Sequence, residues 1–148
     1  MADDFDLDEV TSLVRAIPTE TQKKGDIQSK AKQQSYKKTG WWISSEGVVS
    51  SKDSRDHLDF ILSKLIEADD GLRVIHDRGL LTDICIRWDS KSGHGGPTLS
   101  PVQMARLAEL EIEVWFDIYF HGNDFAYEGN DPPSKQPTKG EQDAPSNR

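Results

Sequence analysis

The stretch from Glu111 to Phe120 reads Glu-Ile-Glu-Val-Trp-Phe-Asp-Ile-Tyr-Phe. Its even-numbered positions are all apolar, and its odd-numbered positions are acidic or aromatic. Because side chains alternate across a strand with a period of two, this pattern predicts a strand with one buried, apolar face. The residues predicted to be buried are Ile112, Val114, Phe116, Ile118 and Phe120.

The opposite face of this strand is the candidate partner-binding surface. Tyr and Trp supply large, rigid contact areas, and acidic side chains steer a basic partner. Carboxylates two residues apart on a strand lie roughly 7 Å from each other, a spacing that could also serve acid–base chemistry or a hard cation. A plain solvent-facing surface is the simplest alternative. The face consists of Glu111, Glu113, Trp115, Asp117 and Tyr119.

Composition indicates one acidic globular domain with extensions. The chain has 148 residues and a net charge of -8. An acidic surface repels phosphates, so we expect no nucleic-acid partner, whereas a basic protein would suit it. The chain contains no apolar run long enough for a membrane span, and its acidic start, Met1–Phe5, is unlike a signal peptide. The single cysteine, Cys85, is expected to be buried, and these features together favour the cytoplasm.

Two polar segments flank or interrupt the predicted domain, which we place at residues 1–128. Residues 19–38 are expected to form a mobile basic loop, because their lysines are spaced by polar residues without an apolar pattern. Residues 129–148 contain four prolines and no large apolar residue, so we expect a disordered tail. The lysines of the loop are Lys23, Lys24, Lys30, Lys32, Lys37 and Lys38.

The remaining periodicity predicts an α+β fold. Apolar residues at helical spacing predict helices over residues 7–17, 51–70 and 101–110, the second ending at Asp69-Asp70-Gly71. Asp6 and Ser100 are the expected N-caps of the first and third helices. Strands are predicted over residues 40–43, 80–88 and 111–120. We expect a ferredoxin-like-type sheet of about three to five strands, with two or three helices on one face.

A conventional catalytic or metal site is not evident from the sequence. The four histidines lack the helical spacing of a zinc site, and no phosphate-binding glycine motif is present, so we expect no metal and no cofactor. The glycine-rich loop Ser92–Gly96 contains His94. An alternative hypothesis is therefore a small-ligand-binding protein or enzyme with a cleft near His94 and the tryptophans, of which Trp42 is the candidate ligand-binding residue. The histidines are His57, His76, His94 and His121.

The order of several short motifs resembles a known family. The motifs are Ile17-Pro18-Thr19, Lys24–Asp26, Gly40-Trp41-Trp42, Leu99-Ser100-Pro101 and Phe116–Phe120. In order and spacing they resemble the bacterial family called domain of unknown function 4279, over residues 4–121. The resemblance implies an α+β fold and a bacterial origin. It implies no activity, so no functional residue is carried over.

One departure from this family concerns the start of the chain. Members usually have a strand before the first helix, and here only Met1–Phe5 precede it. Either the true start lies upstream or the strand is missing. A missing strand would leave an open sheet edge, and exposed edges recruit other strands. We therefore expect the chain to form a homodimer through this edge or to accept a partner strand there.

These observations favour a non-enzymatic protein-binding module. The specific hypothesis is an immunity protein that neutralises a basic toxin. A structural or regulatory subunit has the same expected features, because it too would bind another protein.

Overall fold

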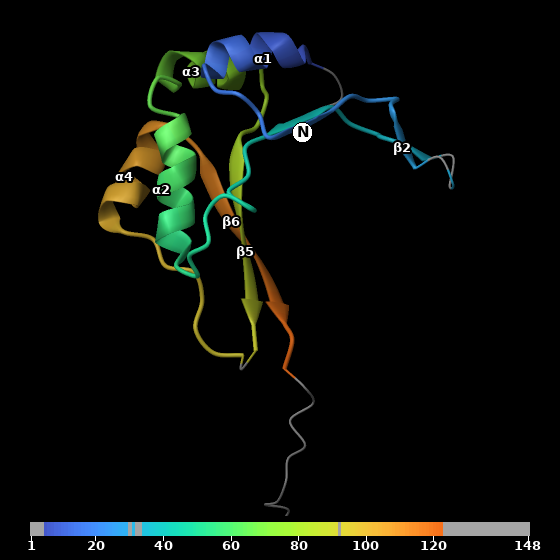
Figure 1. Cartoon of the computed structure of the whole chain (residues 1–148). Helices are drawn as coiled ribbons and strands as arrows, with labels where there is room; N and C mark the ends of the chain where they lie inside the picture. Colours follow the sequence, from blue (N-terminus) through green and yellow to red (C-terminus); the bar gives the residue numbers. More distant parts are fainter. Residues whose placement is uncertain (1–4, 30, 32–33, 92, 123–148) are drawn as a thin grey trace, which may run out of the picture.

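The computed structural model describes residues 5–29, 31, 34–91 and 93–122. The predicted disordered tail and the start of the chain lie outside these residues. Within them the chain folds into helices and short sheets, which confirms the α+β class (Figure 1). The helices are α1 (Leu7–Val14), α2 (Ser54–Lys64), α3 (Asp69–Asp77) and α4 (Pro101–Glu109). The strands are β1 (Glu20–Gln22), β2 (Ile27–Ser29), β3 (Gln34–Ser35), β4 (Gly40–Trp42), β5 (Asp83–Ser90) and β6 (Glu113–Phe120).

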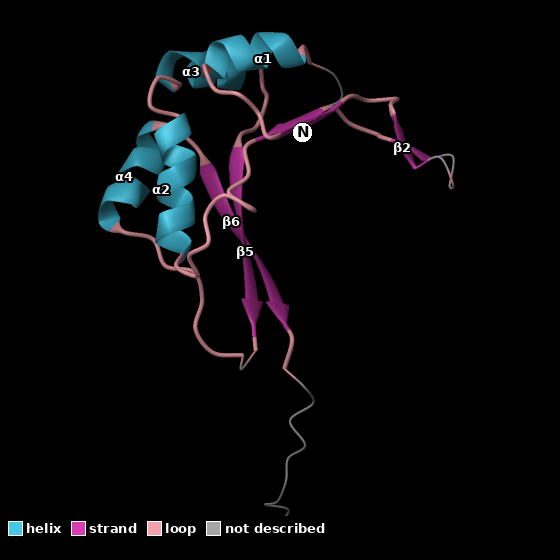
Figure 2. Cartoon of the chain, viewed as in Figure 1, coloured by secondary structure: helices cyan, strands magenta, loops and turns pink. Residues whose placement is uncertain are grey.

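The described strands form three two-stranded sheets rather than one larger sheet. β1 pairs with β4 and β2 with β3, both antiparallel, whereas β5 pairs with β6 in parallel. Figure 2 shows the β5–β6 pair as the longest strands, beside α2 and α4, with the β2–β3 pair projecting from the body. The ferredoxin-like arrangement is therefore not confirmed.

Helix α1 begins where the sequence predicts and ends one turn earlier. The Asp6 carboxylate accepts hydrogen bonds from the backbone N–H groups of Asp8 at 2.8 Å and Glu9 at 3.1 Å. Arg15 adopts the left-handed conformation, with φ of 56°, and ends the helix. Ile17, the last residue of the predicted helix, lies beyond its end and is exposed.

The prediction of one long second helix ending at Gly71 is wrong. Helix α2 ends at Lys64, and a separate helix, α3, begins at Asp69 and contains Gly71. A side-chain carbon at Gly71 would overlap the backbone of Leu13 in α1. This glycine therefore allows two helices to approach closely instead of ending one. The core beside this contact contains Val14, Ala16, Leu65, Ala68, Leu72, Ile75 and Leu110.

Residues 19–38 contain β1, β2 and β3, where the sequence predicted only a loop. Backbone groups make these pairs, so they need no alternation of apolar side chains. The Thr39 hydroxyl, which is buried, accepts a hydrogen bond of 3.2 Å from the backbone N–H of Lys24. The indole N–H of Trp41 donates to the Thr11 hydroxyl at 3.0 Å, which links β4 to α1.

Polar contacts made by α4 join three helices and position β6. Ser100 and Gln103 form the predicted capping box. The side-chain amide of Gln103 also donates to the Arg55 carbonyl oxygen at 2.8 Å, on α2. Arg106 binds both carboxylate oxygens of Asp69, at 2.8 and 2.7 Å, and thereby ties α4 to α3. Because β6 starts four residues after α4 ends, these contacts fix where β6 enters the structure.

Candidate protein-binding surface

The candidate surface lies on a ribbon made of β5 and β6. The two strands pair in register from Asp83 opposite Glu113 to Ser90 opposite Phe120. The N–H of His121 extends the pairing by donating to the Ser90 carbonyl oxygen at 2.8 Å. Figure 2 shows the carboxyl-terminal halves of both strands extending beyond α2 and α4. The ribbon therefore presents side chains that the helices do not cover.

One face of the ribbon combines carboxylates with two aromatic side chains, and we call it the acidic aromatic face. Its members follow from the register and from the alternation of side chains along each strand. It consists of Asp83, Cys85, Arg87 and Asp89 on β5 and of Glu113, Trp115, Asp117 and Tyr119 on β6.

Glu111 does not belong to this face, contrary to the extent of the predicted strand. β6 begins at Glu113, and Glu111 lies in the preceding turn with a positive φ of 54°. Its carboxylate lies 3.8 Å from Nδ1 of His76. The turn thus separates Glu111 from the four predicted partner-binding residues that β6 brings together.

The two aromatic residues of the face are half exposed and held by neighbours. Trp115 is 48% exposed, and its indole N–H donates to the Asp83 carboxylate at 2.6 Å. Tyr119 is 43% exposed, and the guanidinium of Arg87 lies 5.0 Å from the centre of its ring. Both rings therefore present apolar area to solvent in a fixed orientation.

The net charge of the acidic aromatic face is negative. Its four carboxylates are those of Asp83, Asp89, Glu113 and Asp117, against the single guanidinium of Arg87. Arg87 binds Asp89 at 2.9 Å and, together with His121, lowers the pKa of that carboxyl group. A hydrogen bond with Asp117 raises the pKa of Tyr119, which keeps its hydroxyl protonated.

Cys85 is exposed on the acidic aromatic face, so the prediction that it is buried is wrong. It occupies an odd-numbered position on β5 and shares the outward side with Asp83 and Arg87. Partial desolvation raises the pKa of its thiol, and the negative charges of Asp117 and Asp83 raise it further. The thiol is therefore protonated at neutral pH and a weak nucleophile.

The even-numbered residues form the second face, which we call the apolar face. It contains Ile84, Ile86, Trp88 and the buried Ser90 on β5 and Val114, Phe116, Ile118 and Phe120 on β6. The prediction that the β6 side chains are buried is wrong for its outer half. Phe116 is 44% exposed, Ile118 is 61% exposed and Phe120 is 55% exposed. The strand continues past the helices, and although the Phe120 ring lies against Gly93 and Gly122, this half stays largely exposed.

Such exposure is unusual for parallel strands. Parallel sheets are normally covered on both faces, and an isolated pair of strands is only marginally stable in water. Among the strands that the structure describes, β6 is paired only with β5, which leaves its other edge open. The ribbon therefore offers an apolar face, an acidic aromatic face and an unpaired edge together.

The structure does not bring together His94 and Trp42, the two predicted ligand-binding residues. His94 is exposed on the loop that follows β5, and a side-chain carbon at Gly95 would lie 3.8 Å from the Trp88 ring. Trp42 lies on β4, and its ring covers Gly40 so closely that a side chain there would overlap it. Figure 1 places β4 and this loop at opposite ends of the ribbon.

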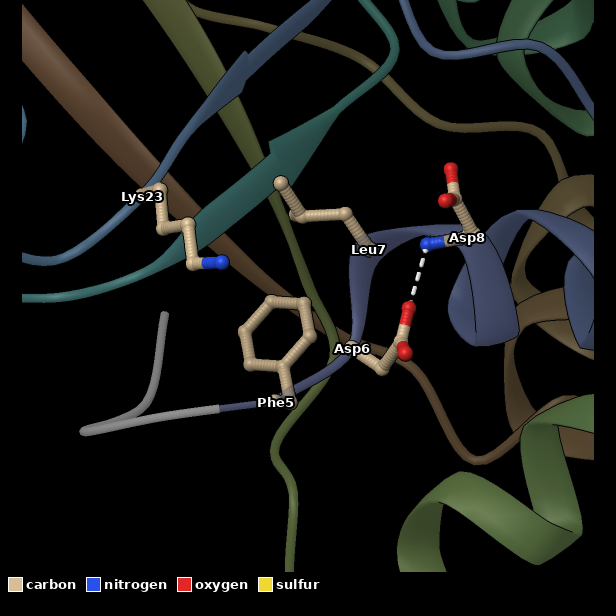
Figure 3. Close-up of a pocket in the computed structure, with 5 residues that line it drawn as sticks. All are labelled: Phe5, Asp6, Leu7, Asp8 and Lys23. Atoms are coloured by element: carbon tan, nitrogen blue, oxygen red, sulfur yellow. Dashed lines mark hydrogen bonds between the residues drawn. The ribbon is translucent and has the colours of Figure 1, made fainter.

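A pocket of about 590 Å³ lies elsewhere, at the start of α1 (Figure 3). Its polar groups include the Asp6 carboxylate, which already caps the helix through Asp8, and the amine of Lys23. The pocket is lined by Phe5, Asp6, Leu7, Asp8 and Lys23.

Two other kinds of site are not found in the described part of the chain. It contains no group of three or more metal-ligating side chains. None of its helices combines the length and the apolar character that a membrane span needs.

A serine–histidine contact was missed at the level of sequence. Nδ1 of His57 lies 2.8 Å from the Ser45 hydroxyl, and Nε2 lies 2.7 Å from the Ser51 carbonyl oxygen. If Nε2 carries the proton and donates to the Ser51 carbonyl oxygen, Nδ1 is free to accept a hydrogen bond from the Ser45 hydroxyl. This is the arrangement of a nucleophile and its general base. Both contacts also fasten the loop before α2 to its first turn, and this tethering is the role that the geometry accounts for.

The partner-binding surface predicted from the sequence did not include the β5 residues of the acidic aromatic face. Asp83, Arg87 and Asp89 alternate in the sequence, but their position beside β6 depends on a parallel crossover through α4. His121 was likewise missed, although its ring stacks with Tyr119 at 6.2 Å between ring centres and binds Asp89 at 2.5 Å.

No curated protein and no solved structure matches this chain. The model of the family described as domain of unknown function (DUF4279) matches residues 1–121, which include every described helix and strand. The chain therefore belongs to the DUF4279 family.

Proposed function

We propose that this protein is a non-enzymatic protein-binding module whose acidic aromatic face binds a basic protein. The observation that carries the proposal is the exposure of Trp115 and Tyr119 among four carboxylates on one ribbon face. Trp and Tyr are enriched among the residues that dominate binding energy at interfaces. Surrounding carboxylates accelerate the approach of a basic partner and discriminate against acidic ones.

The geometry of the face favours binding for a second reason. The hydrogen bond to Asp83 orients the Trp115 ring before any partner arrives. The cation–π contact with Arg87 does the same for Tyr119. Side chains that are already ordered lose less conformational entropy on association, so more of their contact energy contributes to affinity.

The specific form of this proposal is an immunity protein of the bacterial cytoplasm that neutralises a basic toxin. A net charge of -8 supports electrostatic attraction to such a toxin. The single cysteine cannot form an internal disulfide, which is typical of proteins from a reducing compartment.

The test is co-purification of the tagged full chain from a native lysate of cells that naturally make it. We expect a basic protein to be retained at low salt and released as ionic strength rises. Trp115→Ala should reduce its recovery. The matched control is Val102→Ala, because Val102 is also exposed and apolar but belongs to α4 and not to the ribbon. Absence of any salt-sensitive partner, or equal loss in both variants, would exclude this function.

A further inference from the structure

The free edge of β6 and the exposed half of the apolar face occur on the same strand. The edge is eight residues long and has no partner other than β5 among the described strands. Three exposed apolar side chains, Phe116, Ile118 and Phe120, lie along it. Unpaired backbone groups beside uncovered apolar side chains are the two requirements for addition of another strand.

We propose that β6 accepts an extended strand from its protein partner, and that this strand alternates apolar with basic residues. The inference rests on the proposed function and adds the mode of binding and the sequence pattern of the partner. The pattern follows from β6 itself, because side chains of adjacent strands share the same two faces.

On one side of the added strand, the partner meets apolar side chains. Residues directly opposite on neighbouring strands have Cβ atoms about 5 Å apart, which is close enough for direct packing. Apolar partner residues at alternate positions would therefore cover Phe116, Ile118 and Phe120 on the side away from β5.

On the other side, the partner meets the acidic aromatic face. Its intervening residues would lie opposite Glu113, Trp115, Asp117 and Tyr119 of β6. Lysine or arginine there would face the two carboxylates and the aromatic rings, with which cations interact favourably. Charge complementarity thus selects a basic residue at every second position.

A second copy of this chain fits the same edge less well. If two β6 strands paired with their apolar sides on one face, their acidic sides would also share a face. Glu113 and Asp117 of both copies would then lie on one surface, and each chain carries a net charge of -8. Like charges on adjacent strands are destabilising. The charge pattern therefore favours a basic partner strand over self-pairing.

The first experiment measures binding of a capped peptide to the full chain by titration calorimetry. The probe alternates valine with lysine over eight residues, the length of β6. One control peptide has the same composition in two blocks, and another replaces each lysine with glutamate. We expect the alternating peptide to bind at least about tenfold more tightly than either control, because only it matches both faces.

The second experiment tests the backbone with two N-methylated versions of the alternating peptide. In an added strand, every second N–H points toward β6 and the others point to solvent. Methylation of the first set should abolish binding, because it removes the ladder hydrogen bonds, and methylation of the second set should change the affinity little. Equal affinity of both versions would overturn strand addition.

The third experiment places a charge on the apolar side of the edge. Ile118→Lys should weaken binding of the alternating peptide at least about tenfold. The new lysine replaces an apolar contact with the valines of the peptide by a positive charge, and the peptide is itself positively charged. Ile118 is exposed, so this variant should keep the thermal stability of the parent chain. Val102→Lys is the matched control on α4 and should bind as the parent does.

The outcomes separate this inference from the proposed function. If the block peptide and both methylated peptides bound as tightly as the alternating one, strand addition would be wrong, while recognition of basic partners would stand. If the alternating peptide did not bind, strand addition would also be wrong, and co-purification would decide the function. Concentration-dependent dimerisation abolished by Ile118→Lys would show instead that a second copy occupies the edge.

Discussion

The indole N–H of Trp115 on β6 donates a hydrogen bond of 2.6 Å to the carboxylate of Asp83 on β5. It joins two residues that are 32 positions apart in sequence and lie diagonally across the parallel ribbon, where Cys85 is directly opposite Trp115. One side of the ring remains available to a partner, while the hydrogen bond fixes its orientation. This contact connects the register of the ribbon with the surface that we propose for binding.

Two substitutions at Trp115 should separate ring area from ring orientation. Trp115→Ala removes both, and we expect the dissociation constant for the basic partner to rise roughly thirtyfold, a loss of about 2 kcal/mol. Trp115→Phe keeps an aromatic ring without the bond to Asp83, so its effect should be smaller. Surface plasmon resonance at fixed salt measures both. Equal affinities in parent and Trp115→Ala would show that the ring lies outside the interface.

Gly71→Ala should destabilise the packing of α1 against α3. The added methyl group would overlap the Leu13 backbone, and the helices would have to separate. Overpacking of this kind reduces the free energy of unfolding by about 1–3 kcal/mol. The matched control is Gly96→Ala, where an added Cβ meets no atom within 4 Å. Urea denaturation measures both, and equal midpoints would refute close packing at Gly71.

Gly71 also shows where sequence reasoning about the fold stops. A glycine after Asp69-Asp70 has the pattern of a helix end, whereas the structure uses it for close approach of two helices. Local pattern did predict both caps, because Asp6 and Ser100 act on residues within one turn. The role of Gly71 in close helix packing depends on its contact with α1, which is distant in sequence. The local pattern around Gly71 therefore could not predict it.

The contact between Arg106 and Asp69 should make stability depend on acidity. The hydrogen bonds from Arg106 lower the pKa of Asp69 in the folded protein. A lowered folded pKa contributes stability above the unfolded value of about 3.9, and that stability is lost as pH falls through the folded pKa. In denaturation curves from neutral pH to about pH 2, Asp69→Asn should therefore flatten the acid limb.

The control for this pH dependence is Asp70→Asn. Asp70 is exposed beside Asp69 on the same first turn of α3, but of these two carboxylates Arg106 binds only that of Asp69. Its removal should leave the acid limb as steep as in the parent chain. Equal flattening in both variants would mean that general charge, and not the contact with Arg106, causes the pH dependence.

Ser100→Ala should weaken α4 and the entry of β6. The Ser100 hydroxyl accepts from the Gln103 backbone N–H at 3.2 Å, and the Gln103 side chain accepts from the Ser100 N–H at 2.9 Å. Loss of an N-cap costs about 1 kcal/mol. Chemical denaturation should show this reduction, whereas Ser63→Ala on the exposed side of α2 should be close to neutral. An unchanged unfolding free energy in Ser100→Ala would exclude a stabilising cap.

Prediction of the candidate surface from sequence succeeded for grouping and failed for burial. Alternation correctly placed Trp115 and Tyr119 on one side of a strand and Phe116 and Ile118 on the other. It could not tell whether another element covers either side, because coverage depends on where the helices end relative to the ribbon. For the same reason Cys85, with apolar neighbours in sequence, was predicted to be buried and is exposed.

The central claim is that the β5–β6 ribbon binds the protein partner. Hydrogen–deuterium exchange of the full chain, with and without the partner recovered at low salt, tests it most directly. The account predicts that protection on binding is concentrated in Glu113–Phe120, with the amides of α1 unchanged. Protection confined to α1 or to the β2–β3 pair, with exchange in β6 unaltered, would contradict it.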